Sequence, residues 1–357
     1  MTAGEADPGR LRTVPFAGRR NKVDPSLLAA IPGDDRTFAA FLAALPDILA
    51  ARDLRLVIDH LAAAVRRRRG VVLLLGGHVI KTGLGPLLGD LVARGAITHV
   101  AMNGAAAIHD YELAAFGGTS EDVEAGLADG TFGMVEETGA EMNAAIVAAA
   151  ARDAGLGEGL ADALANRGAL AGGEASLMLA CRQHGAGLTV HPAIGADIIH
   201  QHPAFDGAAL GAAAARDFRR LAGALPALDD GGAVLNFGSA VMMPEVFLKA
   251  LTVARNLGDG VPRNFLAADF DMIRHYRPRM NVVQRPTRAG GVGVQITGHH
   301  EIMIPLLAWG LREELDRFSK ERIETRKRLR EVRHQQAKDI EALGTRLKLA
   351  NTVLVPA

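Results

Sequence analysis

Five consecutive apolar residues, Val71-Val72-Leu73-Leu74-Leu75, constrain the fold of this chain more than any other feature of its 357-residue sequence. A strand without polar alternation is buried on both faces, as in parallel sheets that are covered by helices. Gly76-Gly77-His78 follows, then an amphipathic segment through about Arg94, then a second apolar run at residues 97–102. This strand, helix and strand together have the size of one parallel crossover. The sequence therefore predicts an α/β protein.

The same alternation continues along the chain. We expect helices at residues 37–68, helices around a turn within residues 119–170, and a further helix at residues 174–184. Residues 187–190 and 232–237 read as strands, and residues 266–273 and 292–297 are weaker candidates. The predicted fold class is α/β, with a Rossmann-like parallel sheet flanked by helices.

Two extensions flank this α/β unit, which we place at residues 37–310 and expect to contain the active site. Residues 1–36 are polar and contain Gly and Pro, so we expect them to wrap the protein surface or a neighbouring subunit. Residues 311–357 form a C-terminal helical extension, in which a long amphipathic helix carries most of its apolar residues on one face. Such a helix packs on its own domain or on a partner subunit, and we expect a homo-oligomer, a dimer or a tetramer.

Composition excludes several classes of protein. Formal net charge is zero and acidic residues are interleaved with the basic ones near the C-terminus, so we expect no nucleic-acid partner. A single cysteine, Cys181, excludes a disulfide framework. We expect no membrane span, because no apolar run approaches the roughly 20 residues that a span requires. The N-terminal residues lack the pattern of a signal peptide, so a cytoplasmic protein is expected.

Glycine and polar side chains gather where the apolar runs end. In open α/β sheets, ligands bind at the carboxyl ends of the strands, so we expect these residues to line one cleft. The stretch after residue 102 reads as a turn of small residues that lets a ligand approach the backbone. The candidate residues at these strand ends are Gly76, Gly77, His78, Asn103, Gly104, His109, Asp110, Glu112, His191, Asp197, Gly238 and Ser239.

Proton transfer is the chemistry that His109 suggests, because imidazole titrates near neutral pH. Asp110 and Glu112 would orient that base or bind a cationic amine. Gly76 and Gly77 lack the G-x-G-x-x-G spacing. They would hold a pyrophosphate on backbone N–H groups or form only a tight turn.

Three further residues, His299, His300 and Glu301, follow the last predicted strand. They allow a metal site, but the spacing of H-E-x-x-H is absent, so we expect substrate contact or structural hydrogen bonding and no metal. Lys249 lies near the start of a predicted helix, where it would form a Schiff base or face solvent. Glu245 falls in the first turn of that helix, where a carboxylate also favours the helix dipole.

The region 71–112 resembles the NAD-binding core of deoxyhypusine synthase, with Asp110 at an acidic position of that family. Residues 189–199 are similar to its strand and Pro-Ala turn ending in Gly-Asp, and residues 236–241 are similar to its late Gly-rich turn. The family has a nucleophilic lysine just after that turn, where Glu245 stands here and Lys249 is only a loose equivalent. The resemblance therefore implies the fold and NAD, but not true deoxyhypusine synthesis.

A second resemblance concerns His109-Asp110-Tyr111-Glu112 and Phe116-Gly117-Gly118-Thr119-Ser120. These stretches are similar to the ornithine cyclodeaminase domain of bifunctional arginine-degrading enzymes. Both families imply NAD-dependent hydride transfer through an imine, on an amine substrate such as ornithine or a polyamine. In that chemistry His109 would be the base, His191 and Asp197 would flank the cofactor, and His299, His300 and Glu301 would close the substrate side.

Two other functions stay open from the sequence. A regulatory protein of the same fold would bind NAD without catalysis, as loss of the family lysine suggests. A sugar-phosphate or nucleotide enzyme would use the same edge of the sheet. Retention of His109, Asp110 and Glu112, and of the cluster Gly298-His299-His300-Glu301, favours the NAD-dependent enzyme, because a cofactor sensor has no need of them.

Overall fold

A computed structural model describes the backbone of residues 5–353 and the side chains of residues 5–344. Its centre is one six-stranded sheet in the order β3-β2-β1-β4-β5-β6, and every neighbouring pair of strands is parallel. The strands are β1 (Val71–Leu75), β2 (His99–Asn103), β3 (Gly187–His191), β4 (Ala233–Phe237), β5 (Leu266–Asp271) and β6 (Val292–Thr297). All six strands were predicted from the sequence. The strand order reverses between β1 and β4, which is where open α/β sheets bind ligands.

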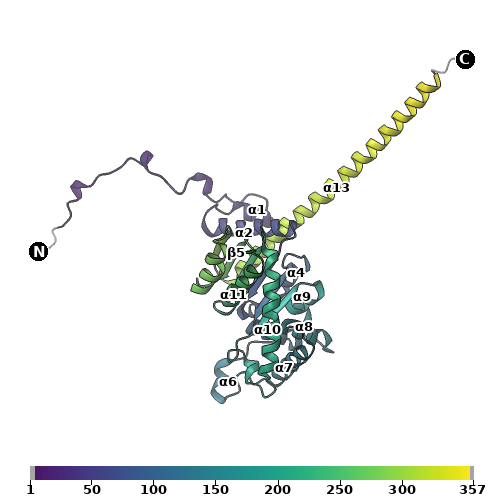
Figure 1. Ribbon diagram of the computed structural model, residues 1–357. Helices are drawn as coiled ribbons and strands as arrows, with labels where there is room; N and C mark the ends of the chain where they lie inside the picture. Colours follow the sequence, from purple (N-terminus) through teal and green to yellow (C-terminus); the bar gives the residue numbers. More distant parts are fainter. Residues whose placement is uncertain (1–4, 354–357) are drawn as a thin grey trace.

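Helices cover both faces of the sheet (Figure 1). They are α1 (Phe38–Ala44), α2 (Leu49–Arg66), α3 (Gly77–Lys81), α4 (Gly85–Ala93), α5 (Gly104–Phe116), α6 (Val123–Asp129), α7 (Glu136–Ala151), α8 (Leu156–Asn166), α9 (Leu177–His184), α10 (Gly207–Ala224), α11 (Met242–Leu257), α12 (Arg285–Thr287) and α13 (His300–Val353). Residues Pro278–Gln284 form a π-helical turn.

Alternate residues of β1 pack into two separate cores. Leu73 and Leu75 belong to the larger core with α2, α4, α5 and the first turns of α13. Val72 and Leu74 belong to the smaller core with α11, the end of α10 and the π-helical turn. All five β1 residues are buried, which explains why the run lacks polar alternation.

Several element boundaries differ from the sequence prediction. Residues 37–68 form two helices, because Leu45 and Pro46 separate α1 from α2. The segment after β1 is also two helices, α3 and α4, with Gly83 between them at φ 81°. The expected turn after β2 is wrong. Helix α5 starts at Gly104, because Asn103 accepts a hydrogen bond from the N–H of Ala106 (2.8 Å) and the alanines that follow favour a helix.

Both ends of the described chain extend away from the domain, in different directions (Figure 1). Residues 5–26 are all exposed, and they do not wrap the domain; short 3₁₀ turns lie in their path at Pro8–Arg10, Phe16–Gly18 and Pro25–Leu27. Helix α13 begins at His300, eleven residues before the predicted start, and packs against α1, α2 and α4. Leu315 is the last buried residue before the helix projects from the domain. None of the helices in the described part is long and apolar enough to cross a membrane.

Candidate functional site

A cavity of about 640 Å³ lies at the carboxyl ends of β1, β2 and β3. Its walls come from α5, from the segment that joins α5 to α7, and from the loop after β3. The polar side chains in its lining are Lys81, His109, Glu112, Thr119, Ser120, Glu121, Glu137, Thr138 and Asp197. Three of the predicted site residues, His109, Glu112 and Asp197, therefore meet in one cavity.

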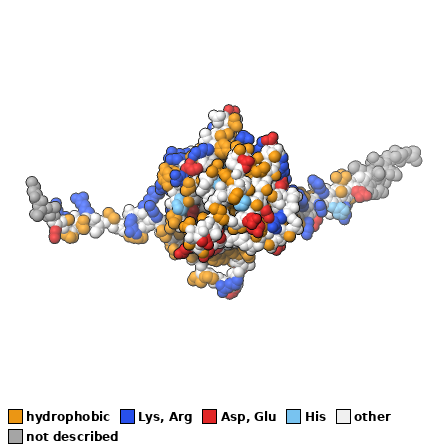
Figure 2. Space-filling view, turned by 90° about the horizontal axis from the view of Figure 1, so that it is seen from below, with side chains coloured by type: hydrophobic (Ala, Val, Ile, Leu, Met, Phe, Trp, Pro, Cys, Tyr) orange, Lys and Arg blue, Asp and Glu red, His pale blue; other side chains and the backbone are white. Residues whose placement is uncertain are grey.

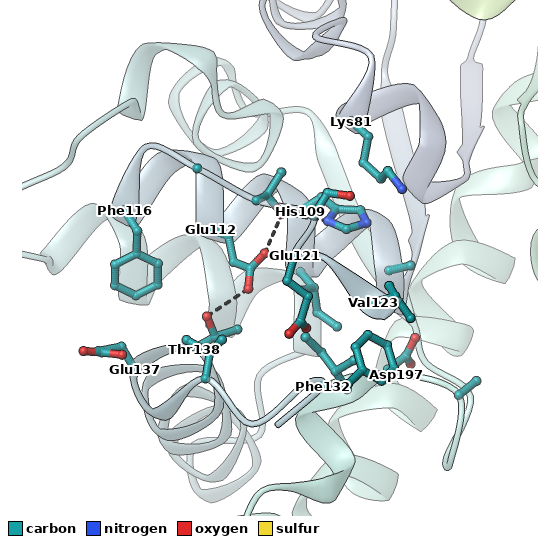
Figure 3. Close-up of a pocket in the computed structure, with 18 residues that line it drawn as sticks. Lys81, His109, Glu112, Phe116, Glu121, Val123, Phe132, Glu137, Thr138 and Asp197 are labelled. Carbon is teal, nitrogen blue, oxygen red and sulfur yellow. Dashed lines mark hydrogen bonds between the residues drawn. The ribbon is translucent and has the colours of Figure 1, made fainter. Parts of the chain in front are cut away.

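His109 and Glu112 are joined by a hydroxyl group (Figure 3). The Thr119 hydroxyl donates to Oε2 of Glu112 (2.5 Å), and the Thr138 hydroxyl donates to Oε1 of the same carboxylate (2.9 Å). Since the Thr119 proton goes to Glu112, its Oγ1 accepts from Nδ1–H of His109, 2.7 Å away. This network assigns the tautomer of His109 and leaves the lone pair on Nε2.

The imidazole of His109 is neutral at neutral pH. Burial, with a smaller contribution from the charge of Lys81, lowers the pKa of His109 to about 4. Lys81 points its ammonium group toward this ring from the end of α3 (Figure 3). A neutral ring with an unprotonated Nε2, held by a hydroxyl and a carboxylate, has the arrangement of a general base.

Carboxylates dominate the charge of the cavity. Glu112, Glu121, Glu137 and Asp197 line it, against the single ammonium group of Lys81. Figure 2 shows the end of the molecule that carries α6, where acidic side chains lie intermixed with hydrophobic ones. A cavity lined by these carboxylates and by apolar side chains attracts a ligand with cationic groups and an apolar body.

Asp197 lies against the N-terminal turn of α5. A Cβ on Gly104 would lie 2.1 Å from Oδ2 of Asp197, so only glycine leaves room for this carboxylate. Oδ2 accepts from the N–H of Ala193 (3.0 Å), and burial raises the pKa of Asp197. Because a carboxylate already occupies the positive end of α5, this place suits a ribose hydroxyl or an amine better than a phosphate.

Asp110 has a different environment from its neighbours in sequence. It is buried outside the cavity lining, and its carboxylate accepts from the hydroxyl of Ser176 (2.7 Å) and from the N–H groups of Leu177 (2.8 Å) and Met178 (3.0 Å). These donors form the start of α9. In the structure Asp110 therefore joins α5 to the N-terminus of α9 and does not reach the cavity.

The glycines at the strand reversal are explained by close packing. A Cβ on Gly76 would lie 2.1 Å from the carbonyl oxygen of Gly238, and one on Gly77 would lie 3.0 Å from Cβ of Ala105. Ser239 accepts the N–H of Met243 at the start of α11 (3.2 Å). Of the two interpretations of Gly76-Gly77, these contacts support the tight turn.

His78 and His300 form a second polar group at the same edge, on the β4 and β5 side of α3. Their ring centroids are 5.5 Å apart, and Nε2 of His300 lies 3.2 Å from the carbonyl oxygen of Phe270. His300 is buried, and its Nδ1 has no hydrogen-bond partner among the described residues. Its neighbours His299 and Glu301 are exposed and lie 3.8 Å apart. The described residues contain no group of three or more His, Cys, Asp or Glu placed to hold a metal ion.

The remaining predicted site residues lie away from the cavity. Glu245 and Lys249 pair with each other on the surface of α11, and Glu245 also accepts from Arg277 (3.1 Å). The side chain of Lys249 is 58% exposed, so it has no environment that would favour a Schiff base. His191 is buried beside Thr189 (3.0 Å), and burial lowers the pKa of His191 to about 3.

Sequence reasoning did not assign roles to Thr119, Thr138, Glu121 and Glu137. Thr119 and Thr138 bond to Glu112 from segments that follow α5, and nothing in their local sequence shows this. The stretch Phe116-Gly117-Gly118-Thr119-Ser120 was noted only for its resemblance to the cyclodeaminase domain, and that resemblance gave Thr119 no role.

Two polar groups at this edge of the sheet are compatible with a nicotinamide dinucleotide. The orphaned Nδ1 of His300 is a buried polar group that ordinarily has a partner, and it lies where the strand order reverses. On the other side of α3, Asp197 accepts the N–H of Ala193 through Oδ2, and its Oδ1 accepts no hydrogen bond from the described residues. His78, His300 and the turn at Gly238 would hold one half of the cofactor, and Asn103 and Gly104 the other, which leaves Asp197 for the substrate.

Comparison with protein-family models and with curated proteins found no match. Solved structures with a similar arrangement include a putative LOR/SDH protein from Methanococcus maripaludis S2, with TM-score 0.44 and 16% identity over 83% of this chain and 74% of that chain. AgrE in complex with ornithine and NAD+ has TM-score 0.44 and 16% identity over 77% of this chain. The match spans only 34% of the AgrE chain.

A putative deoxyhypusine synthase from Entamoeba histolytica has TM-score 0.46 and 10% identity, over 78% of this chain and 96% of that chain. These scores and identities are too low for the activities of those proteins to carry over to this one. Its function has to be argued from its own cavity.

Proposed function

We propose that this protein is an enzyme that binds a small amine or amino acid in the cavity beside His109 and uses NAD as its cofactor. The observation that carries the proposal is the hydrogen-bonded line from His109 through Thr119 to Glu112, on the wall of a cavity rich in carboxylates. A wall built only for packing has no need of a neutral histidine held in one tautomer.

Recognition of the substrate depends on charge. Asp197, Glu121 and Glu137 would bind the ammonium groups, and Ile108, Phe116 and Phe132 would contact the carbon chain. Lys81 is the one cation of the lining and would pair with a carboxylate if the substrate is an amino acid.

His109 would remove a proton from the substrate ammonium group through Nε2. The imidazolium that forms keeps its Nδ1–H bond to Thr119, and the charge of Glu112 stabilises it through that hydroxyl. The low pKa of His109 keeps Nε2 unprotonated at neutral pH, before the substrate binds.

NAD, when bound, supplies a hydride acceptor for the carbon that carries the amine. The residues of this chain would position the cofactor from both sides of α3, and the apolar lining would exclude water from the reacting carbon. Glu245 and Lys249 have no part in this scheme, because they lie on the surface of α11.

The test is to incubate the full-length protein with NAD+ and either ornithine or putrescine, and to follow ammonia release and NADH absorbance. We expect turnover that Thr119→Val and His109→Gln both reduce strongly. Glu158→Gln is the matched control, since Glu158 lines a separate hollow that also contains His99 and Gly187, from the starts of β2 and β3. Binding of NAD+ without turnover of any amine would favour the regulatory protein. No binding of NAD+ would reject the cofactor.

A further inference from the structure

The projecting part of α13, which begins after Leu315, carries apolar side chains that nothing in the described chain covers. Four of them have exposed fractions of 53% (Leu329), 53% (Val332), 72% (Ile340) and 60% (Leu343), and a fifth, Ile323 at 56%, lies on a different side of the helix. At 3.6 residues per turn all four fall on one face of the helix, together with Gln336. A single solvated helix has no need of such an apolar stripe.

Two ion pairs and a side-chain hydrogen bond stabilise the same helix without using the stripe. Arg328 pairs with Glu324 (2.6 Å), Arg317 pairs with Glu321 (3.5 Å), and Gln335 donates to Asp339 (2.9 Å). Each pair is spaced by four residues and stabilises an isolated helix. The apolar stripe therefore contributes nothing to these pairs, and it indicates a surface for another helix.

The spacing of the stripe is the same in both directions about Gln336. Its positions, 329, 332, 336, 340 and 343, are separated by three, four, four and three residues. We propose that α13 pairs with α13 of a second copy of this chain as an antiparallel coiled coil, with Gln336 on the two-fold axis. In this register Leu329 faces Leu343 of the second copy, Val332 faces its Ile340, and the two Gln336 amides meet.

Charge favours the antiparallel direction. Residues 328–333 carry three arginines and one glutamate, whereas residues 339–344 carry Asp339 and Glu341 and no basic residue. The proposed register brings these two segments side by side, so each basic segment lies against an acidic one. A parallel pair in register would place the arginines of residues 328–333 beside those of the second copy, and Arg322 beside Arg322 of the second copy. This repulsion between like charges is unfavourable.

The length of the helix agrees with this register. The projecting part runs from residue 316 to Val353, and Gln336 lies near its middle. Two copies crossing at Gln336 therefore overlap along nearly the whole projecting part. The end of each helix comes beside the base of the other, where Arg66, Arg68, Arg94 and Arg322 surround a hollow of about 440 Å³.

Disulfide cross-linking of the full-length protein tests both the pairing and its direction. The native thiol of Cys181 is buried, so introduced cysteines report on α13 alone. Leu329→Cys and Leu343→Cys are made as separate single variants and oxidised, first alone and then as an equimolar mixture. Gln336→Cys tests the axis, and Lys338→Cys, on the opposite face of the helix, is the matched control.

We expect Gln336→Cys to form a disulfide-linked dimer and Lys338→Cys to remain single chains. The mixture of Leu329→Cys and Leu343→Cys should link, while each variant alone should not. Linkage of each variant alone would show a parallel pair and overturn the proposal. A single-chain mass for the wild-type protein by light scattering, or a dimer that none of these cysteines links, would overturn it as well.

Discussion

Replacing Asp217 with asparagine is expected to stabilise the protein at neutral and higher pH. Asp217 lies on α10 and is fully buried. Its Oδ2 accepts the N–H groups of Gly157 and Val190, both at 2.8 Å, whereas Oδ1 has no hydrogen-bond partner among the described residues. An asparagine keeps one oxygen for both N–H groups and removes the buried charge, so it loses neither bond.

The size of the effect follows from the pKa of Asp217. Burial raises this pKa from 3.8 to about 7. Since the folded-state pKa is above the unfolded value, the stability that this proton contributes is fully present below the unfolded pKa of 3.8 and is lost as the pH rises from there through about 7. A shift of this size corresponds to roughly 4 kcal/mol of unfolding free energy, lost at about 1.4 kcal/mol per pH unit.

Urea unfolding of the wild-type protein and of Asp217→Asn, between about pH 4 and pH 8, measures this difference. The variant should match the wild type within about 1 kcal/mol at the acidic end and exceed it by a few kcal/mol at the alkaline end. Two results would refute the reasoning. One is a difference that does not change with pH, and the other is a variant less stable than the wild type at pH 8.

Three further predictions concern the cavity and its support. Asp110→Asn should lower the unfolding free energy by roughly 1–3 kcal/mol in urea, because an amide leaves one donor at the start of α9 without an acceptor; an unchanged midpoint would contradict the role of Asp110 in joining α5 to α9. Lys81→Met should raise the pKa of His109 in an NMR titration but not restore the ordinary value, because burial is the larger cause; no shift would show that Lys81 does not act on the ring. Thr119→Val should lower kcat on an amine substrate by about 10²-fold or more and change KM little. A fall in kcat matched by an equally large rise in KM would indicate a structural role.

The sheet was predictable because its strands are short apolar runs that end in glycine or polar residues. Val71 to Leu75 is buried on both faces, as its unbroken apolar run predicted. The helix starting at Gly104 was not foreseen, because glycine and alanine after a strand also suit a turn. The helix is favoured by a cap in which the N–H of Ala106 donates to Oδ1 of Asn103, and that bond depends on backbone geometry.

The candidate site was predictable in part, for a physical reason. His109 and Glu112 are three residues apart and face the same side of α5, whereas Asp110 points to another side and caps α9. Neighbours in sequence can thus face different surroundings on a helix, and only the packing shows which of them face a ligand. Thr138 meets Glu112 from another helix, a contact that spacing along the chain does not predict.

The most direct test of the proposed function is calorimetric titration of ornithine and of putrescine into the protein in the presence of NAD+. Saturable binding of at least one of them to the wild type is predicted, with a large loss of affinity in Asp197→Asn, which keeps the bond to Ala193 and removes one cavity charge. Glu158→Gln, outside the cavity, should bind as the wild type does. Absence of binding of either amine, or equal binding by Asp197→Asn and the wild type, would contradict an amine site in this cavity.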